Sequence, residues 1–309
     1  MPPAAASVSV AFQGERGAFS EMAALQYFAS TSSSTSTSSS VDTTAITLVP
    51  CKSFAEAFSA AEKKQVDYAV IPVENSIEGS VPEVYDLLMQ TRLKATGEVY
   101  HRVHHCLIAG RDIRISEIKR AYSHPQALGQ CRQYLQKKGI EPVPAYDTAG
   151  SVKMVKEQGA RDAAAIASRR AAELYGMEIL EEGIEDRKSN YTRFLVLALP
   201  DYKDDRKAKT TTTIMNGSSR QQSYYKTSII FSVKHVPGAL FGILGEFASR
   251  SLNLTKIESR PTKETPWEYN FYVDFEGHAG DAPVKQVLEA IKDKTSYLKI
   301  IGSYKKAEF

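Results

Sequence analysis

Residues 189–199 read Ser-Asn-Tyr-Thr-Arg-Phe-Leu-Val-Leu-Ala-Leu, and this stretch decides the class of fold. The apolar run from Phe194 to Leu199 has the length and composition of a buried strand. Hydroxyl, amide and guanidinium side chains crowd just before it, and α/β proteins bind their ligands at the ends of buried strands. The stretch therefore predicts an α/β sheet with a polar site where this strand begins.

The composition limits the class of protein. A chain of 309 residues, 42% of them apolar, is long enough for about two domains with real cores. The 39 basic and 36 acidic residues are dispersed and give a formal charge of only +3, so we expect no nucleic-acid or membrane partner. Three cysteines lack metal or disulfide spacing, and there is neither a secretory signal nor an apolar run of about 18 residues, which together predict a cytoplasmic protein.

Strand and helix patterns alternate along residues 7–200, which predicts a mostly parallel sheet covered by helices. Ser53 and Glu56 form a capping-box pattern at the start of one helix. The serine- and threonine-rich tract 29–40 cannot bury apolar surface and is predicted to be a disordered surface loop, and the polar stretch 201–226 is predicted to be a linker. Strands are predicted at 7–12, 66–73, 103–109, 121–123, 143–146, 163–167 and 194–199.

The pattern changes after the linker. An alternating strand pattern at 229–233 is followed by a helix pattern after Pro237. Two further strand patterns, 252–259 and 267–275, precede a second helix and a last strand. This βαββαβ order predicts a ferredoxin-like domain over residues 227–305.

Polar clusters lie just past several predicted strand ends. Three of them precede helices, whose first backbone N–H groups lack partners and carry partial positive charge. Because such groups suit an anion, convergence of the clusters predicts a site for a small carboxylate. The clusters are Gly14 with Gly17 and Ser20, Glu74-Asn75-Ser76, Ser123-His124-Pro125-Gln126 and Asp147 to Ser151, and Asn190 with Thr192 forms a fifth.

The sequence lacks the residue patterns that a phosphate-binding loop, a hydrolase triad or a metal site would require. Gly14 and Gly17 have neither the lysine nor the spacing of a phosphate loop, and no Gly-x-Ser-x-Gly elbow supports a hydrolase triad around Ser123. Three neighbouring histidines lack the spacing of a metal site, so no metal is expected and they are predicted to be surface or strand residues. They are His101, His104 and His105.

Several motifs, taken together, are specific enough to indicate a protein family. They are Gly14-x-x-Gly17-x-Phe19-Ser20, Pro72-Val73-Glu74-Asn75-Ser76-x-x-Gly79, Ser123-His124-Pro125-Gln126-Ala127-x-x-Gln130-Cys131, Asp147-Thr148-Ala149, Asn190-x-Thr192-Arg193-Phe194, Gly238-Ala239-Leu240 and Glu258-Ser259-Arg260-Pro261. With these motifs the chain closely resembles the prephenate dehydratases over nearly its whole length, and its C-terminal part resembles the ACT regulatory domain of that family.

The resemblance implies a bilobal α/β catalytic domain, like the periplasmic binding proteins, over residues 7–200, with the second lobe at about 103–180. It also implies the reaction, in which prephenate loses its ring carboxylate and its ring hydroxyl and gives phenylpyruvate, CO2 and water. No cofactor is needed, because aromatisation supplies the driving force. No chorismate mutase helices precede the dehydratase region, so a monofunctional enzyme is expected.

Residue roles follow from the same resemblance. Thr192 is the family's catalytic threonine and is expected near the departing hydroxyl, where its hydrogen bond would strengthen as negative charge grows. Arg193 either compensates charge or acts as a structural strut, and Glu74 and Asp147 are alternative candidates for polarising the hydroxyl system. The residues expected to bind substrate are Asn75, Ser76, Ser123, Gln126, Gln130, Asp147, Thr148, Ala149, Ser151 and Asn190.

The ACT resemblance implies an allosteric effector, L-phenylalanine, bound at an interface between subunits of a homodimer or homotetramer. Feedback inhibition then requires the effector to bind an inactive arrangement better than the active one. The residues expected to bind it are Gly238, Ala239, Leu240, Asn253, Glu258, Ser259 and Arg260.

Three alternatives stay open at this point. An arogenate dehydratase runs the same chemistry on an amino acid. A non-catalytic, amino-acid-sensing or transport protein with the same bilobal fold would keep the oxygen-rich cleft without needing Thr192. An aromatic amino-acid hydroxylase has similar Gly-Ala-Leu and Glu-Ser-Arg-Pro motifs, but its His-His-Glu iron site has no candidate helix here.

Overall fold

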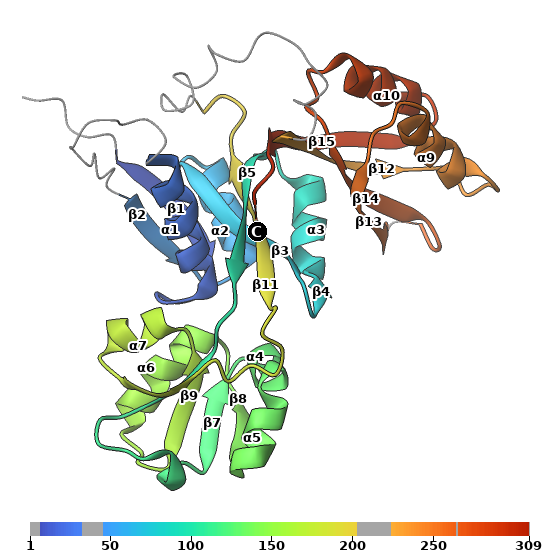
Figure 1. Cartoon of the computed structure of the whole chain (residues 1–309). Coiled ribbons are helices and arrows are strands. Elements are labelled where there is room, and N and C mark those ends of the chain that lie inside the picture. Colours follow the sequence, from blue (N-terminus) through green and yellow to red (C-terminus); the bar gives the residue numbers. More distant parts are fainter. Residues whose placement is uncertain (1–6, 33–45, 203–223, 264, 309) are drawn as a thin grey trace, which may run out of the picture. The chain divides into compact units, whose positions relative to one another are not determined.

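The computed structural model describes residues 7–32, 46–202, 224–263 and 265–308 (Figure 1). The chain forms two compact units, of which the first comprises residues up to 84 together with 99–194. The second comprises 85–98 and the residues from 195 onward. The boundaries between the two units fall within α3, β5 and β11.

The first sheet is built around β1, which pairs in parallel with β2 on one side and with β3 on the other. Its strand order is β2-β1-β3-β11-β5, and the short β4 pairs antiparallel with the end of β3. Helices α1 and α2 contact β1, whose apolar residues are therefore buried. The elements are β1 (Val8–Gln13), α1 (Phe19–Ser32), β2 (Ile46–Cys51), α2 (Phe54–Glu62), β3 (Tyr68–Asn75), β4 (Gly79–Ser80), α3 (Pro82–Gln90), β5 (Lys94–Arg102) and β11 (Tyr191–Ala198).

Local sequence signals explain where these helices begin and end. The Ser53 side chain accepts a hydrogen bond from Glu56 N at 3.1 Å, which confirms the predicted cap, and Glu56 accepts from Lys52 N at 2.7 Å. Helix α1 continues to Ser32, so the first residues of the tract 29–40 are helical and the prediction of a loop is wrong there. The rest of that tract, from residue 33, lies outside the described residues.

The second sheet has the order β10-β6-β9-β7-β8 and is mixed. β7 pairs in parallel with β8 and β9, whereas β6 pairs antiparallel with β9 and β10. The prediction of a mostly parallel sheet is therefore wrong for β6 and β10. The elements are β6 (Cys106–Ala109), β7 (Arg120–Ser123), α4 (Pro125–Gln130), α5 (Arg132–Lys138), β8 (Glu141–Pro144), α6 (Thr148–Gln158), β9 (Ala163–Ala167), α7 (Arg169–Tyr175) and β10 (Glu178–Glu182).

The helix predicted after Ser123 is two helices, α4 and α5, which meet at Cys131. Its predicted end at Gly139 is confirmed, because Gly139 caps α5 in the left-handed conformation with φ of 68°. Strand β9 reads Ala-Ala-Ala-Ile-Ala and is buried along its whole length. The two α/β sheets of the catalytic region confirm the expected two-lobed α/β architecture.

The C-terminal sheet has the order β13-β14-β12-β15, with antiparallel pairing throughout. Figure 1 shows α9 and α10 together on one face of it, and residues of both helices share its hydrophobic core. This order of elements confirms the predicted ferredoxin-like βαββαβ domain. The elements are β12 (Tyr225–Ser232), α9 (Ala239–Ser249), β13 (Leu254–Pro261), β14 (Tyr269–Glu276), α10 (Ala282–Lys292) and β15 (Tyr297–Lys305).

Two boundaries differ from the sequence-based expectation. The predicted linker 201–226 falls mostly outside the described residues, and β12 already begins at Tyr225. Trp267, the first residue of the alternating run 267–275, lies before β14 with a positive φ of 67° and is 77% exposed. Among the described helices, none is long and apolar enough to cross a membrane.

The second unit also contains the end of α3 and the beginning of β5, held by side chains of the C-terminal domain. Lys299 Nζ donates to the carbonyl oxygens of Leu88, Met89 and Thr91 at 2.9, 2.8 and 2.6 Å. A lysine is well placed there, because the last carbonyls of a helix lack intrahelical partners and carry partial negative charge.

Candidate active site

The side chains of Asn75 and Thr192 meet where β3 ends and β11 begins. Asn75 Nδ2 donates to Thr192 Oγ1 at 3.0 Å. The orientation of the Asn75 amide follows from its other contacts, since Oδ1 accepts from the backbone N–H groups of Ile77 and Glu78 at 2.9 and 3.0 Å. Because the oxygen is turned towards those two donors, the NH2 group must face Thr192.

A chain of amide side chains extends inward from this pair. Asn75 Nδ2 also donates to Asn190 Oδ1 at 2.8 Å, and Asn190 Nδ2 donates to Gln130 Oε1 at 2.9 Å. Asn75, Asn190 and Gln130 are all buried. The structure thus brings together four of the sequence-predicted site residues, from three separate parts of the chain.

The direction of these hydrogen bonds leaves two donors for a ligand. Thr192 Oγ1 accepts from Asn75, and within the described residues its own hydroxyl proton has no acceptor. Gln130 Oε1 is occupied as an acceptor, and within the same residues its Nε2 donates to no protein group. A hydroxyl and an amide N–H are therefore available where an oxygen-rich ligand would bind.

Sequence reasoning missed His105, which it placed among surface or strand histidines. The residue is 2% exposed, and its ring Nε2 lies 2.9 Å from Gln130 Oε1. Its only sequence signal was membership of the cluster with His101 and His104. In the parts of the chain that the structure describes, no group of His, Cys, Asp and Glu side chains could hold a metal ion.

Two predicted substrate ligands use their hydroxyl protons inside the protein. Ser123 Oγ donates to Ile166 O at 2.6 Å, and Ser151 Oγ donates to Asp147 O at 2.6 Å. Both serines are fully buried. Their hydroxyl groups can still accept a hydrogen bond, so their role in binding stays a prediction.

Asp147 caps α6, with Thr148 and Ala149 in its first turn. Its Oδ1 accepts from Gly150 N at 2.7 Å. Burial raises the pKa of the Asp147 carboxyl above its ordinary value, although the hydrogen bonds from the α6 backbone oppose this. Gly14 lies against this carboxylate, because a Cβ added there would be 3.2 Å from Asp147 Oδ2.

Gly17 shows why one cluster requires glycine. A Cβ there would lie 2.7 Å from Ala171 Cα, and the residue has a φ of 90°. Its carbonyl accepts from Ser168 Oγ at 2.6 Å, so this close approach joins the start of α1 to the start of α7.

Ser76 and Gln126 have different environments. Ser76 Oγ accepts from Tyr191 N at 2.9 Å and donates to Ser189 O at 3.2 Å, which links the end of β3 to the start of β11. Gln126 is exposed in the first turn of α4. Tyr191 to Arg193 belong to β11 itself, so the polar residues lie inside the strand and not before it.

Glu74 and Arg193 are the sequence neighbours of Asn75 and Thr192. Side chains alternate between the two faces of a strand, so Glu74 and Arg193 point away from the face on which Asn75 meets Thr192. Arg193 is 5% exposed. This geometry favours the structural strut for Arg193, and the catalytic roles of both residues stay predictions.

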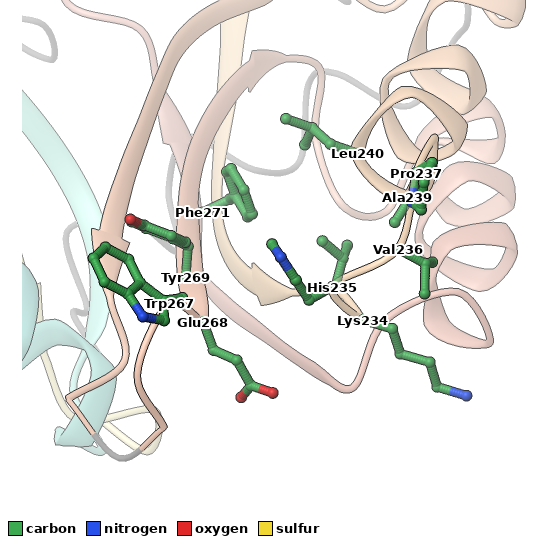
Figure 2. A pocket seen from close by; sticks show the side chains of 11 residues that line it. Lys234, His235, Val236, Pro237, Ala239, Leu240, Trp267, Glu268, Tyr269 and Phe271 are labelled. Carbon is green, nitrogen blue, oxygen red and sulfur yellow. The ribbon is translucent and has the colours of Figure 1, made fainter.

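The C-terminal domain contains a cavity of about 390 Å³ between the start of α9 and β14. Figure 2 shows Trp267, Tyr269 and Phe271 on the β14 side and Pro237, Ala239 and Leu240 on the α9 side, with His235 between them. Of the predicted effector residues, Ala239 and Leu240 line this cavity and Gly238 lies directly before α9. The remaining four do not line it, and they are Asn253, Glu258, Ser259 and Arg260.

A two-sheet α/β region with a buried amide network, followed by a ferredoxin-like domain with its own cavity, defines a class of enzymes that join a catalytic domain to a small regulatory one. The family model of prephenate dehydratase matches residues 10–201, and that of the ACT domain matches residues 227–293. The chain therefore belongs to the prephenate dehydratase family and is a carbon–oxygen lyase.

Curated relatives agree with this. An arogenate dehydratase/prephenate dehydratase of Arabidopsis thaliana is 40% identical over 96% of this chain and 72% of its own length. A bifunctional chorismate mutase/prephenate dehydratase of Aquifex aeolicus is 36% identical over 97% of this chain and 74% of its own length.

Solved structures are similar over almost the whole chain. A prephenate dehydratase from Arthrobacter aurescens in complex with L-Phe has a TM-score of 0.80 and 29% identity, and the match covers 97% of this chain and 90% of that one. The quorum quenching acylase GqqA has a TM-score of 0.80 and 30% identity, and the match covers 97% of this chain and 99% of that one.

Proposed function

We propose that the chain catalyses the decarboxylating dehydration of prephenate to phenylpyruvate. The bond from the ring to its carboxylate breaks, CO2 leaves, and the electron pair enters the ring. The bond from the ring to its hydroxyl breaks at the opposite carbon, and the departing hydroxide gains a proton to become water. The ring becomes aromatic, so the protein must mainly bind two carboxylates and stabilise the leaving oxygen.

The hydrogen bond from Asn75 Nδ2 to Thr192 Oγ1 carries this proposal. Because Asn75 occupies a lone pair of the hydroxyl, the Thr192 proton is directed outward to the leaving oxygen of the substrate. A threonine hydroxyl is a very poor acid, so it donates a hydrogen bond that strengthens as charge develops and does not transfer its proton fully. Gln130 Nε2–H is suited to a substrate carboxylate.

A second candidate is the dehydration of arogenate. The Arabidopsis relative carries both activities in its name, and its similarity extends over 96% of this chain. Arogenate replaces the side-chain keto group of prephenate with an ammonium group, so the two reactions share the leaving hydroxyl and the ring carboxylate. The Thr192 network serves both substrates equally.

Turnover of the two compounds tests both candidates. The purified full chain is incubated with prephenate and, separately, with arogenate, and the formation of phenylpyruvate and L-phenylalanine is followed. We expect phenylpyruvate from prephenate. Activity on arogenate alone favours the second candidate, and inactivity on both compounds contradicts the enzymatic function.

The cavity of the C-terminal domain is the proposed site of L-phenylalanine as feedback inhibitor. Its Tyr269, Phe271 and Leu240 side chains offer an apolar surface for a phenyl ring, and Lys234 and Glu268 offer opposite charges for an amino acid's carboxylate and ammonium groups. The Arthrobacter aurescens structure, which contains L-Phe, supports the choice of L-phenylalanine as the effector. Couplings between effector and active sites are typically about 1–3 kcal/mol.

The chain's single tryptophan makes this binding measurable. Trp267 lines the cavity, and no other tryptophan contributes to the fluorescence. Titration with L-phenylalanine is expected to change this emission over the concentration range that inhibits turnover. An unchanged emission at inhibiting concentrations would place the effector elsewhere.

The expected homodimer or homotetramer is also a proposal. Trp267 and Val236 line the cavity and are 77% and 58% exposed, and Phe241 on α9 is 80% exposed. This exposure is unusual for large apolar side chains unless a second copy covers them. Sedimentation with and without L-phenylalanine tests this.

A cytoplasmic location is supported by three buried cysteines without disulfide partners, and labelling in cells tests it.

A further inference from the structure

The ring of His105 ends the hydrogen-bond chain that begins at Thr192. Gln130 Oε1 accepts from Asn190 Nδ2 and lies at the same distance, 2.9 Å, from His105 Nε2. An amide oxygen only accepts, so His105 Nε2 carries a proton and donates it to the hydrogen bond. Two donors on one oxygen hold the Gln130 amide in a single orientation.

His105 is itself held firmly. Its backbone N–H donates to Glu185 Oε2 at 3.0 Å, and its ring meets Phe19 edge-on with centroids 5.3 Å apart. Burial lowers the pKa of His105, while Gln130 and Glu185 oppose this and His104 adds to it, so the ring is neutral. Its Nδ1 is buried and has no hydrogen-bond partner among the described residues, which disfavours a proton there.

The alternative orientation of Gln130 shows what His105 contributes. With its amide reversed, Gln130 would turn its NH2 group to the N–H donors of His105 and Asn190, which places donor against donor. Its oxygen would then face the ligand and repel a carboxylate. The observed orientation instead presents the Nε2–H donors to the ligand and leaves Asn190 able to accept from Asn75, the residue that orients Thr192.

We propose that His105 is a positioning residue for the dehydration: its Nε2–H fixes the Gln130 amide, and through Asn190 and Asn75 the direction of the Thr192 hydroxyl. This assignment rests on the proposed function, because it concerns the same reaction. His105 does not touch the substrate in this arrangement, and it acts through Gln130.

Substitutions at His105 can remove its hydrogen-bond donor while keeping an aromatic ring, or keep a donor without the ring. His105→Phe keeps the ring and its contact with Phe19 but removes the donor, so kcat/KM on the substrate that the wild-type chain turns over is expected to fall on the order of 10- to 100-fold. His105→Gln retains an N–H donor at similar reach and is expected to recover much of this loss. In a Gln130→Ala background, His105→Phe is expected to have little further effect, because its target is gone.

A matched control is available in His101, which also contacts Phe19 but bonds to Gln26 outside the network. His101→Phe should leave kcat/KM close to that of the wild type. An equal loss in His101→Phe, a full additive effect in the Gln130→Ala background, or no rescue by His105→Gln would each overturn the proposal.

The tautomer of His105 gives a test that needs neither turnover nor a folded variant. Nitrogen NMR of the labelled wild-type protein at neutral pH is expected to show His105 protonated at Nε2 and bare at Nδ1. A charged ring or the Nδ1–H tautomer would overturn the assignment. Inactivity of the wild type on both substrates, in contrast, would reject the proposed function and leave this measurement standing.

Discussion

Arg260 Nε on β13 lies 3.3 Å from Asp86 Oδ1 on α3, and Lys263 Nζ lies 2.6 Å from the other oxygen of the same carboxylate. Burial alone would raise the pKa of Asp86, but the hydrogen bonds from Lys263 and Arg260 outweigh it and hold the pKa below its usual range. The carboxylate is therefore charged at neutral pH. It ties the Glu-Ser-Arg-Pro motif of the regulatory domain to a helix of the dehydratase region.

This ion pair has a direct connection along the chain to the candidate active site. Helix α3 follows β4, and β4 pairs with the end of β3 at Glu74 and Asn75. Asn75 orients Thr192. Along the chain, α3 and β4 therefore connect Asp86 to Asn75, the hydrogen-bond partner of Thr192.

Replacing Asp86 should weaken feedback inhibition without harming the reaction. In Asp86→Asn the charge pair with Arg260 is lost, so we expect the L-phenylalanine concentration for half inhibition to rise about fivefold or more, the lower end of typical allosteric coupling. Uninhibited kcat/KM should stay close to the wild-type value. Dose–response curves for the two proteins measure this.

Glu246→Gln is the matched control for Asp86→Asn. Glu246 also pairs with two cations, Arg250 and Lys294, but within the C-terminal domain. Its replacement should leave the L-phenylalanine concentration for half inhibition unchanged. If Asp86→Asn is inhibited like the wild type, the connection through α3 is wrong.

Removal of the Thr192 hydroxyl should reduce the rate of the chemical step. Thr192→Ala is expected to lower kcat on the order of 10²–10³-fold, because a donor to the developing negative charge is lost. The fold should persist, since Asn75 Nδ2 keeps acceptors at Asn190 Oδ1 and Tyr191 O, at 2.8 and 3.2 Å.

Thr192→Ser provides the comparison, because it keeps a hydroxyl at the same position. It should retain much more activity than Thr192→Ala. Steady-state kinetics, together with thermal unfolding of both variants, measure this prediction. Near-normal turnover of Thr192→Ala would remove Thr192 from the mechanism.

The meeting of Asn75 and Thr192, which are 117 positions apart, could be expected from the sequence. Both lie beside buried strand patterns, and strand ends in an α/β sheet converge. The βαββαβ order was equally visible, because its strands and helices have clear periodicity. These features depend on local pattern, which a single sequence displays.

Features that depend on tertiary pairing were not visible. The strand β5, Lys-Ala-Thr-Gly-Glu-Val-Tyr-His-Arg, was missed because its polar residues hide the apolar alternation. Its Glu98 is buried and pairs there with Lys226. The hydrogen bond from His105 to Gln130 likewise joins residues whose proximity no periodicity reveals.

Acid should destabilise the protein through the half-buried His101 and the buried His105. Burial lowers the pKa of His101 to about 4 from an ordinary value of 6.5. Between these values the unfolded chain binds a proton that the folded chain does not. The free energy of unfolding should therefore fall as the pH drops from about 6.5 to about 4, by on the order of 2–3 kcal/mol for this residue.

Urea unfolding at about pH 7 and about pH 5, followed by circular dichroism, measures this dependence. Burial also lowers the pKa of His105, which acts in the same direction. His101→Phe should reduce the difference between the two pH values. An unchanged difference in that variant would assign the acid sensitivity to other groups.

The buried ion pair between Lys226 and Glu98 should dominate the stability of the second unit. Lys226 Nζ lies 2.8 and 3.0 Å from the two Glu98 oxygens, and both residues are 3% exposed. Glu98→Gln removes the charge that Lys226 pairs with in this buried site, so we expect a loss of about 3–5 kcal/mol. Urea unfolding followed by Trp267 fluorescence reports on this unit.

Replacing both charges separates the cost of a buried lysine that has lost Glu98 from the value of the pair. In Glu98→Leu with Lys226→Met neither charge of this pair remains, so most of the loss should be recovered. Recovery should stop short of the wild type, because Ala307 N also donates to Glu98 Oε1 at 3.1 Å and would lose its acceptor. If the double variant is as unstable as Glu98→Gln, the loss comes from the attraction between the two charges and not from burying the lysine without Glu98.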